Sequence, residues 1–430
     1  MIVLVALLAG CAPPAAPPAA SPVPRPEPST LEIDEATDAL WASTVEPYLQ
    51  DPLWTDRDIY DAGHELVPAL EAAFRGGQTD WQNDFADHFA RFMAAEKAGY
   101  VSEQRLWRLH YFYLAAHFLN LASTYGRTDI IPDGLPEFLT EDLRSIWFEQ
   151  DAIQWESDPF RGIKARVEWK LDNHDPDPGY FRAMTDEELF SFAIAADLRV
   201  YEREAGADFA PVVEDVLGVA ARVLEQESSY PDDGWLFQVG VWSDYPDYAF
   251  AGVATKSEEM VATPREDVAT DTSHAARWPM WLASLRESSD LGTDRYVMYD
   301  DILTRLGNQF AEHMMIVPTP EVPYLRMTNY MDGWNGLFRW NYGTVAIGDG
   351  YEGFELSGSL LVVWWGMLAD ERVNAAFCEL GRSFPLPEEA IALYVGPNTT
   401  RERNPLVVWP DYFTNGFAEF NVRLMCDLNR

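Results

Sequence analysis

Apolar residues recur at three- and four-residue steps through most of the chain from Leu31 onward, and this spacing predicts amphipathic helices. Start and stop signals support the pattern. Thr185 and Glu188 form a capping box, and Gly126 stands in the position that follows a helix. We predict helices over residues 31–50, 57–75, 79–99, 106–125, 135–154, 185–204, 209–227, 271–288, 294–315, 354–369, 371–381 and 412–426. Strand signals are scarce and short, as at 406–409.

Three long segments without helical spacing separate these elements, namely 155–183, 228–269 and 316–353. Helices joined by short turns pack as antiparallel neighbours. About six such hairpins predict an all-α fold, an (α/α)6 toroid with the long segments on one rim. A solenoid of helical pairs is the competing architecture, but no repeating sequence period supports it. We therefore expect one toroid domain over residues 31–430.

The start of the chain has the pattern of an export signal. Residues 1–10 are apolar and lead to Cys11, and residues 11–30 form a tether rich in Pro and Ala. The apolar run is shorter than the about 20 residues that span a bilayer, so it predicts a signal peptide. Leu8-Ala9-Gly10-Cys11 resembles the bacterial lipobox, although no Lys or Arg precedes it. This resemblance implies a lipid-anchored protein of the periplasm or cell surface.

Charge and cysteine content narrow the classes of partner. The 70 acidic and 31 basic residues leave a net charge of −39, which argues against nucleic acid, because phosphate binding needs a basic surface. Export would allow Cys378 and Cys426 to form a disulfide, and two buried thiols are the alternative. No Cys/His spacing of a metal site is present, so we predict neither a metal nor a cofactor.

The segment Asp271-Thr-Ser-His274-Ala-Ala-Arg277 brings an acid, an imidazole and a guanidinium into the first turns of a predicted helix. Taken alone, it is more typical of a capping Asp, a core His and a surface Arg than of a functional site. A His in the first turn lies near the rim, however, where the long segments are expected. We therefore predict His274 as a catalytic residue and Asp271 and Arg277 as substrate-binding residues.

The loop over residues 329–343 is rich in aromatic, polar and glycine residues. Such a loop either folds into the core as a plug or lines a cleft, and binding residues concentrate on loops held by a rigid scaffold. We favour the cleft. Its candidate residues are Tyr330 for catalysis and Asp332, Trp334, Asn335, Arg339 and Trp340 for substrate binding.

Other candidates lie in the remaining long segments. Asn173-His174 stands among turn-forming residues, and 228–269 contributes Trp242 and Tyr248. Six carboxylates are spaced along the same regions: Asp244, Asp247, Asp271, Asp332, Glu352 and Glu355. For Glu355, at the start of a predicted buried helix, favourable interaction with the helix dipole is a sufficient structural explanation.

These features together resemble the (α/α) toroid enzymes of carbohydrate metabolism, namely polysaccharide lyases such as the alginate lyase group and uronyl epimerases. Asn173-His174 looks like the adjacent Asn-His pair of some lyases, and Asp271–His274 like their helix-opening acid-plus-His segments. The resemblance implies that Asn173 neutralises a uronate carboxylate and that a His or Tyr abstracts the C5 proton. The candidates are His174, His274, Tyr248 and Tyr330, with Arg277 and Arg339 holding the carboxylate.

Two other functions stay open. A glycoside hydrolase needs two carboxylates across the scissile bond, and the six carboxylates above supply candidates. A lipoprotein that binds a glycan or a partner without catalysis is the third possibility. The sequence favours a glycan-active, membrane-anchored protein, with lyase or epimerase chemistry ahead of hydrolysis.

Overall fold

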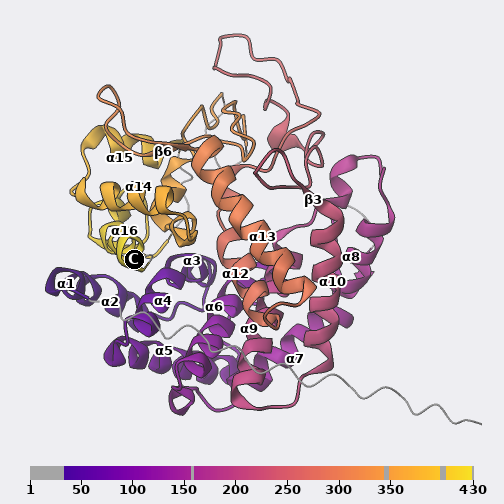
Figure 1. Cartoon of the computed structure of the whole chain (residues 1–430), viewed down its shortest axis with the longest axis vertical. Helices are drawn as coiled ribbons and strands as arrows, with labels where there is room; N and C mark the ends of the chain where they lie inside the picture. Colours follow the sequence, from indigo (N-terminus) through magenta and orange to yellow (C-terminus); the bar gives the residue numbers. More distant parts are fainter. Residues whose placement is uncertain (1–32, 156–158, 343–347, 398–402, 429–430) are drawn as a thin grey trace, which may run out of the picture.

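The computed structural model describes residues 33–155, 159–342, 348–397 and 403–428, and it is mostly α-helical, as predicted (Figure 1). The predicted signal, Cys11 and tether lie outside these residues. The helices are α1 (Glu35–Ser43), α2 (Val45–Gln50), α3 (Asp58–Glu65), α4 (Val67–Arg75), α5 (Thr79–Ala98), α6 (Arg105–Thr124), α7 (Leu135–Phe148), α8 (Gly162–Asp172), α9 (Asp186–Ala205), α10 (Pro211–Glu227), α11 (Thr272–Ala275), α12 (Trp278–Ser288), α13 (Asp294–Gln309), α14 (Glu371–Arg382), α15 (Glu388–Val395) and α16 (Phe417–Leu428).

Strands in the described part of the chain form only two-residue antiparallel ladders. The strands are β1 (Asp151–Ala152) with β2 (Phe160–Arg161), β3 (Ser228–Ser229) with β4 (Leu236–Phe237), and β5 (Met315–Ile316) with β6 (Arg326–Met327). Short 3-10 turns, including η2 (Gly179–Arg182), η3 (Pro246–Tyr248), η5 (Ser357–Val362), η6 (Trp364–Met367) and η7 (Asp411–Phe413), fill the longer connections. These small elements fix loops rather than build a sheet.

Several local signals are confirmed. The capping box opens α9, with the Glu188 carboxylate accepting from the backbone N–H of Thr185 at 2.8 Å. Gly99 follows α5 at φ +74° and Gly126 lies at φ +69°, the left-handed conformation that glycine adopts without steric cost. Each of these positions ends or starts a helix within a residue or two of the predicted boundary.

Three predicted helices are broken near a proline. The predicted helices 31–50, 57–75 and 271–288 divide into α1 and α2, α3 and α4, and α11 and α12. Pro47, Pro68 and Pro279 lie in the first turn of the second member of each pair. Proline lacks the N–H that continues a helix but is tolerated in a first turn. The chain therefore changes direction at each of these positions.

Other predictions were wrong. The helix expected over 354–369 is a pair of 3-10 turns, η5 and η6, because Val363 between them has φ +64°. The strand expected at 406–409 is a turn. Helix α8 lies within the segment predicted to be irregular, and α15 was also missed.

A series of contacts links the inner helices. Helix α3 packs on α6, α6 on α9, α9 on α12 and α12 on η6, while α16 packs on both η6 and α4. Helices α5, α7, α10 and α13 lie outside this series, each against one of its members. Figure 1 shows the first helices, α1 to α4, beside α16 near the end of the chain. The N-terminal and C-terminal parts of the described chain thus support each other.

A buried histidine joins several of the inner helices. His117 of α6 donates from Nδ1 to Asp197 of α9 at 3.1 Å and contacts Glu71 of α4 through Nε2 at 2.8 Å. Asn120 also donates to Asp197 at 2.7 Å. Burial alone would lower the pKa of His117, but the charges and hydrogen bonds of Asp197 and Glu71 raise it well above its ordinary value. The imidazolium is therefore an ionic link at the centre of the fold.

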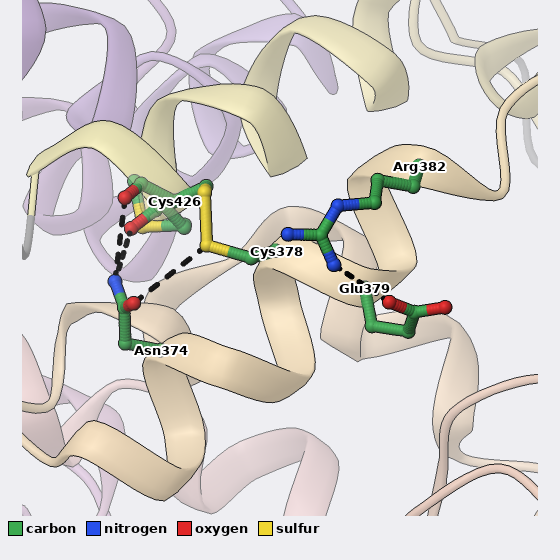
Figure 2. The surroundings of a disulfide bond; sticks show 6 residues. Asn374, Cys378, Glu379, Arg382 and Cys426 are labelled. Atoms are coloured by element: carbon green, nitrogen blue, oxygen red, sulfur yellow. Dashed lines mark hydrogen bonds and ion pairs between the residues drawn. A yellow bond between two sulfur atoms is a disulfide. The ribbon is translucent and has the colours of Figure 1, made fainter.

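The disulfide that the sequence left open is formed between Cys378 of α14 and Cys426 of α16. Figure 2 shows the bond beside Asn374, whose side chain donates to the Met425 and Cys426 carbonyls. The cysteines are 48 residues apart, so the chain-entropy model gives the cross-link about 4 kcal/mol of stabilisation. The bond holds α16, which also contacts the early helices α1 and α4, against α14.

His117→Ala should lower the free energy of unfolding by about 3–5 kcal/mol, because it leaves two buried carboxylates without their cation. Denaturant titration of both proteins near neutral pH measures the loss. The matched control is His174→Ala, since His174 is exposed and should change stability little. Equal stabilities for His117→Ala and the parent protein would contradict the central ionic link.

Candidate functional site

A cavity of about 370 Å³ lies where the first turns of three inner helices meet. Leu106 of α6, Asp186 of α9 and Trp278 of α12 line it, each within two residues of the N-terminus of its helix. Loops at 153–155, 237–248 and 338–339 supply the remaining walls. Several loops over rigid helix ends give the geometry in which ligand sites commonly form.

His274 contributes an imidazole to this cavity, and Asp271 fixes its orientation. Nδ1 of His274 lies 2.8 Å from Oδ2 and 3.0 Å from Oδ1 of Asp271. The Asp271 side chain is 1% exposed, whereas that of His274 is 35% exposed. The buried carboxylate thus holds a ring that solvent and ligand can reach.

Hydrogen bonding defines the tautomer of His274. Burial alone would raise the pKa of Asp271, but His274 and Arg339 hold it well below its ordinary value, so Asp271 accepts and Nδ1 carries the proton. Nε2 lies 3.4 Å from Nη2 of Arg339, and a guanidinium nitrogen can only donate. The Nε2 lone pair therefore faces Arg339, which also lines the cavity. This is the arrangement of a histidine general base with an orienting acid.

Asp271 is itself held by three further donors. It caps α11 by accepting from the backbone N–H of His274 at 3.1 Å, and Ser273 Oγ donates to it at 2.6 Å. The Tyr248 hydroxyl donates to Oδ2 at 2.9 Å. Burial raises the pKa of Tyr248 well above its ordinary value, which keeps this hydroxyl a donor. Tyr248, predicted as a catalytic residue, thus orients the acid of the pair.

The first turn of α9 forms the floor of the cavity. Oε1 of Glu188 accepts from Arg166 at 2.7 Å and from Lys170 at 2.6 Å, and both donors come from α8. Burial would raise the pKa of Glu188, but these two cations lower it to about 2. Burial lowers the pKa of Lys170 to about 8, although the neighbouring Glu188 carboxylate acts to raise it. A buried ion cluster thus fixes the turn that carries Asp186 and Glu187.

The other carboxylates of the cavity are also paired with arginines. Asp186 lies 3.3 Å from Arg277, and Asp247 accepts from Nε of Arg339 at 2.8 Å. Glu187 accepts from both Arg105 and Arg166 at 2.9 Å. The cavity therefore combines carboxylates with compensating guanidinium groups, although the chain as a whole is strongly acidic.

Backbone strain is concentrated around the cavity. Trp155, Gln238 and Arg339 all line it and have φ values of +42°, +46° and +54°. Residues with side chains rarely adopt these angles, and such conformations persist only where the surrounding structure enforces them. Three strained positions in one cavity are typical of a functional site.

The structure brings several predicted site residues together. The Asp271 segment and the 329–343 loop are adjacent, with the Thr272 N–H donating to the Asn329 carbonyl at 2.9 Å and a bridge between Asp271 and Tyr330. Six of the predicted residues line the cavity: Trp242, Asp247, Tyr248, Asp271, His274 and Arg339. Arg277 lies behind it, donating to the His274 carbonyl, His64 and Tyr60.

Most of the 329–343 loop is packed rather than open to the cavity. Tyr330 is fully buried and its hydroxyl donates to the Leu337 carbonyl. Trp334 donates to the Ala251 carbonyl, and Asp332 pairs with Arg265. The remaining two predicted residues of the loop are also engaged elsewhere, Asn335 accepting from the Asn329 and Phe354 backbones and Trp340 contacting Phe250. Of the two alternatives for the loop, packing against the rest of the protein thus describes these five residues better than lining the cleft.

The other predicted residues also lie outside the cavity. Asn173 ends α8 and donates to the Trp169 carbonyl, and His174 is exposed. Neither joins His274, so the Asn-His pair is not part of this site. Three further carboxylates have structural contacts. Asp244 accepts from the Gly179 and Tyr180 backbones. Glu352 lies near Lys256, and Glu355 accepts from the Glu352 backbone N–H.

Sequence reasoning missed much of the cavity wall. The missed residues include Trp155, Arg166, Asp186, Glu187 and Tyr245. The sequence carried no distinct signal for Asp186 and Glu187, because acids in a first helical turn are already explained by the helix dipole.

Comparison with known proteins gave no match to any family model, to any curated protein or to any solved structure. Among the described residues, no group of three His, Cys, Asp or Glu side chains is arranged to hold a metal ion. Nor does any described helix have the length and apolar character to cross a membrane. The chemistry of the site is accordingly inferred from its own residues.

Glu188→Gln should lower stability by about 3–5 kcal/mol near neutral pH, since Arg166 and Lys170 lose their buried counter-charge. The lowered pKa of Glu188 also sets a pH dependence. Its contribution is complete above about pH 4.5 and is lost as the pH falls through about 2. Acid titrations of denaturant stability should therefore show a smaller loss over that range in the variant. Glu141→Gln, at an exposed ion pair, is the control and should behave like the parent protein.

Proposed function

We propose that this chain is a glycan-active protein in which His274 acts as the general base of a lyase or epimerase. The observation that carries the proposal is the Asp271–His274–Arg339 arrangement. One imidazole nitrogen is fixed by a buried carboxylate, and the other lies 3.4 Å from the guanidinium of Arg339, which lines the same cavity. Aromatic side chains from Trp155, Trp242 and Tyr245 form the adjoining wall. A base, a cation and an aromatic surface suit a sugar that carries a carboxylate.

In this mechanism Nε2 of His274 removes the C5 proton of a uronate, α to the carboxylate. The C–H electron pair moves into the carboxylate, whose developing charge is stabilised by Arg339. The negative charge of Asp271 stabilises the imidazolium that forms. In a lyase, the enolate then expels the oxygen at C4, which takes up a proton from the His274 imidazolium or from water, and a C4–C5 double bond is left. In an epimerase, C5 takes up a proton from water on the opposite face, and the imidazolium releases its own proton to solvent.

Hydrolysis by paired carboxylates is the second candidate function. The observation in its favour is that Asp186, Glu187 and Asp247 all line the cavity. Hydrolysis needs one carboxyl that donates a proton, and each of these three accepts hydrogen bonds from an arginine instead. Proton abstraction by His274 is therefore the better supported reaction. Binding without catalysis is the third candidate and an outcome of the test below.

The fold of this proposed enzyme is an (α/α) toroid over residues 31–430. The series of contacts from α3 through α6, α9, α12, η6 and α16 to α4 supports it. So does the meeting of the N-termini of α6, α9 and α12 at one cavity, as a toroid of parallel inner helices requires. An experimental structure in which α16 does not meet α4 would contradict the toroid.

Export and anchoring through Cys11 complete the proposal. The lipobox-like sequence and the Pro- and Ala-rich tether support it, and the Cys378–Cys426 disulfide is consistent with an oxidising compartment. Cys11→Ser should move the protein from the membrane fraction to the soluble fraction of a bacterial host. Cys378→Ser is the control and should leave the distribution unchanged. An unmodified Cys11 in the membrane-bound protein, detected by mass spectrometry, would refute lipidation.

The reaction is tested by incubating the purified protein with a panel of polyuronates and neutral glycans. A lyase gives the ultraviolet absorbance of an unsaturated uronide, and an epimerase exchanges the C5 proton with deuterium from solvent. His274→Ala should lower kcat by about 100-fold or more, the usual contribution of a positioned general base. Asp271→Asn should also lower kcat, because the ring loses its fixed tautomer.

His174→Ala is the matched control, since that histidine is exposed and outside the cavity, and it should keep full activity. Unchanged turnover in His274→Ala would refute the assignment of the base. New reducing ends without unsaturation would favour hydrolysis, and binding without any product would favour the third candidate.

A further inference from the structure

The wall of the cavity away from His274 is a cluster of half-buried aromatic rings. Trp155, Trp242 and Tyr245 all line the cavity and remain partly accessible. The centroid of the Trp155 ring lies 6.0 Å from each of the other two, and Trp242 lies 5.2 Å from Tyr245. Two loops far apart in the sequence thus build one aromatic surface, which we call the aromatic wall.

The aromatic wall is held in place from behind. Tyr180 lies 4.9 Å from Trp155 and 5.0 Å from Tyr245, and Phe181 stacks on Trp155 at 6.0 Å. Asp244 accepts from the Gly179 and Tyr180 backbones and so ties η2 to the loop that carries Trp242 and Tyr245. The rings are therefore preorganised, and a ligand need not order them on binding.

A chain of contacts links the aromatic wall to the proposed base. Ile153, two residues before Trp155, also lines the cavity and is 58% exposed. Trp242 stacks on Tyr248, with an interplanar angle of 11° and centroids 5.9 Å apart. Tyr248 in turn donates to Asp271, which holds His274. A ligand with one unit at His274 would place its next unit against the aromatic wall.

We propose that the aromatic wall is a binding subsite for a second sugar ring, so that the protein takes a glycan chain rather than a monosaccharide. The ring would stack its apolar C–H face on the indoles, which combine large apolar surface with polar edges. The proposal rests on the proposed function for the unit that occupies the cavity beside His274.

A quaternary ammonium ligand is the other chemistry that aromatic clusters bind. Such sites gain from nearby carboxylates whose charge is free to attract the cation. Here Asp186, Glu187 and Asp247 already carry arginine partners, and Arg339 is the partner of Asp247. Because these carboxylates are already neutralised, the charge pairing favours a sugar over a cation.

The test is calorimetric titration of the full chain with β-1,4-linked oligouronates and with cello-oligosaccharides, each from monosaccharide to tetrasaccharide. In one of the two series the affinity should rise by about tenfold or more between the monosaccharide and the longer members, equivalent to about 1.4 kcal/mol. Trp242→Ala and Tyr245→Ala should each reduce that gain while leaving the affinity for the monosaccharide within about twofold.

Trp340→Ala is the control, because Trp340 is also a half-buried tryptophan but lies outside the cavity. The subsite is overturned by affinities that do not depend on chain length, by an equal effect of Trp340→Ala, by absence of binding in both series, or by tighter binding of tetramethylammonium. Length-dependent binding without turnover would refute the proposed reaction and leave the subsite standing.

Discussion

A carboxylate that is buried away from water needs hydrogen-bond donors or cations to offset its lost hydration. Two buried carboxylates beside the cavity, Asp271 and Glu188, are stabilised in this way. Asp271 caps α11 and accepts from Tyr248, Ser273 and His274. Glu188 closes the capping box of α9 and accepts from α8. Each carboxylate joins a helix N-terminus to a distant segment. Together they fix the orientation of the imidazole and the position of the cavity floor.

The parts of this arrangement that depend on local sequence were predictable. The capping box, the glycines that end α5 and α6, and the contact of Asp271 with His274 all involve residues a few positions apart. The sequence also indicated that the 271–277 segment and the 329–343 loop belong together. What it did not show was which side of that loop faces the cavity, because this depends on backbone carbonyls in the folded chain, that of Leu337 for Tyr330 and that of the distant Ala251 for Trp334.

Helix α8 shows why other elements escaped prediction. Two of its buried positions are Arg166 and Lys170, whose charges are satisfied by Glu188 of another helix. Because these buried positions carry charged residues, the sequence lacks the regular spacing of apolar residues by which a helix is predicted. The opposite error occurred at 354–369, where a continuous apolar run predicted a buried helix. There Val363, which is fully buried, has a left-handed backbone conformation that ends η5 and starts η6.

The packing of α16 against α1 and α4 has a consequence for how the chain reaches its native state. Arg75 of α4 donates to the carbonyl of Leu428, across 353 positions of sequence. Contacts of such high sequence separation form late, because the entropy of a very long loop opposes them. During synthesis α1 and α4 therefore stay without their α16 partner until residues 417–428 have been made, so the native packing of these early helices forms only after that point.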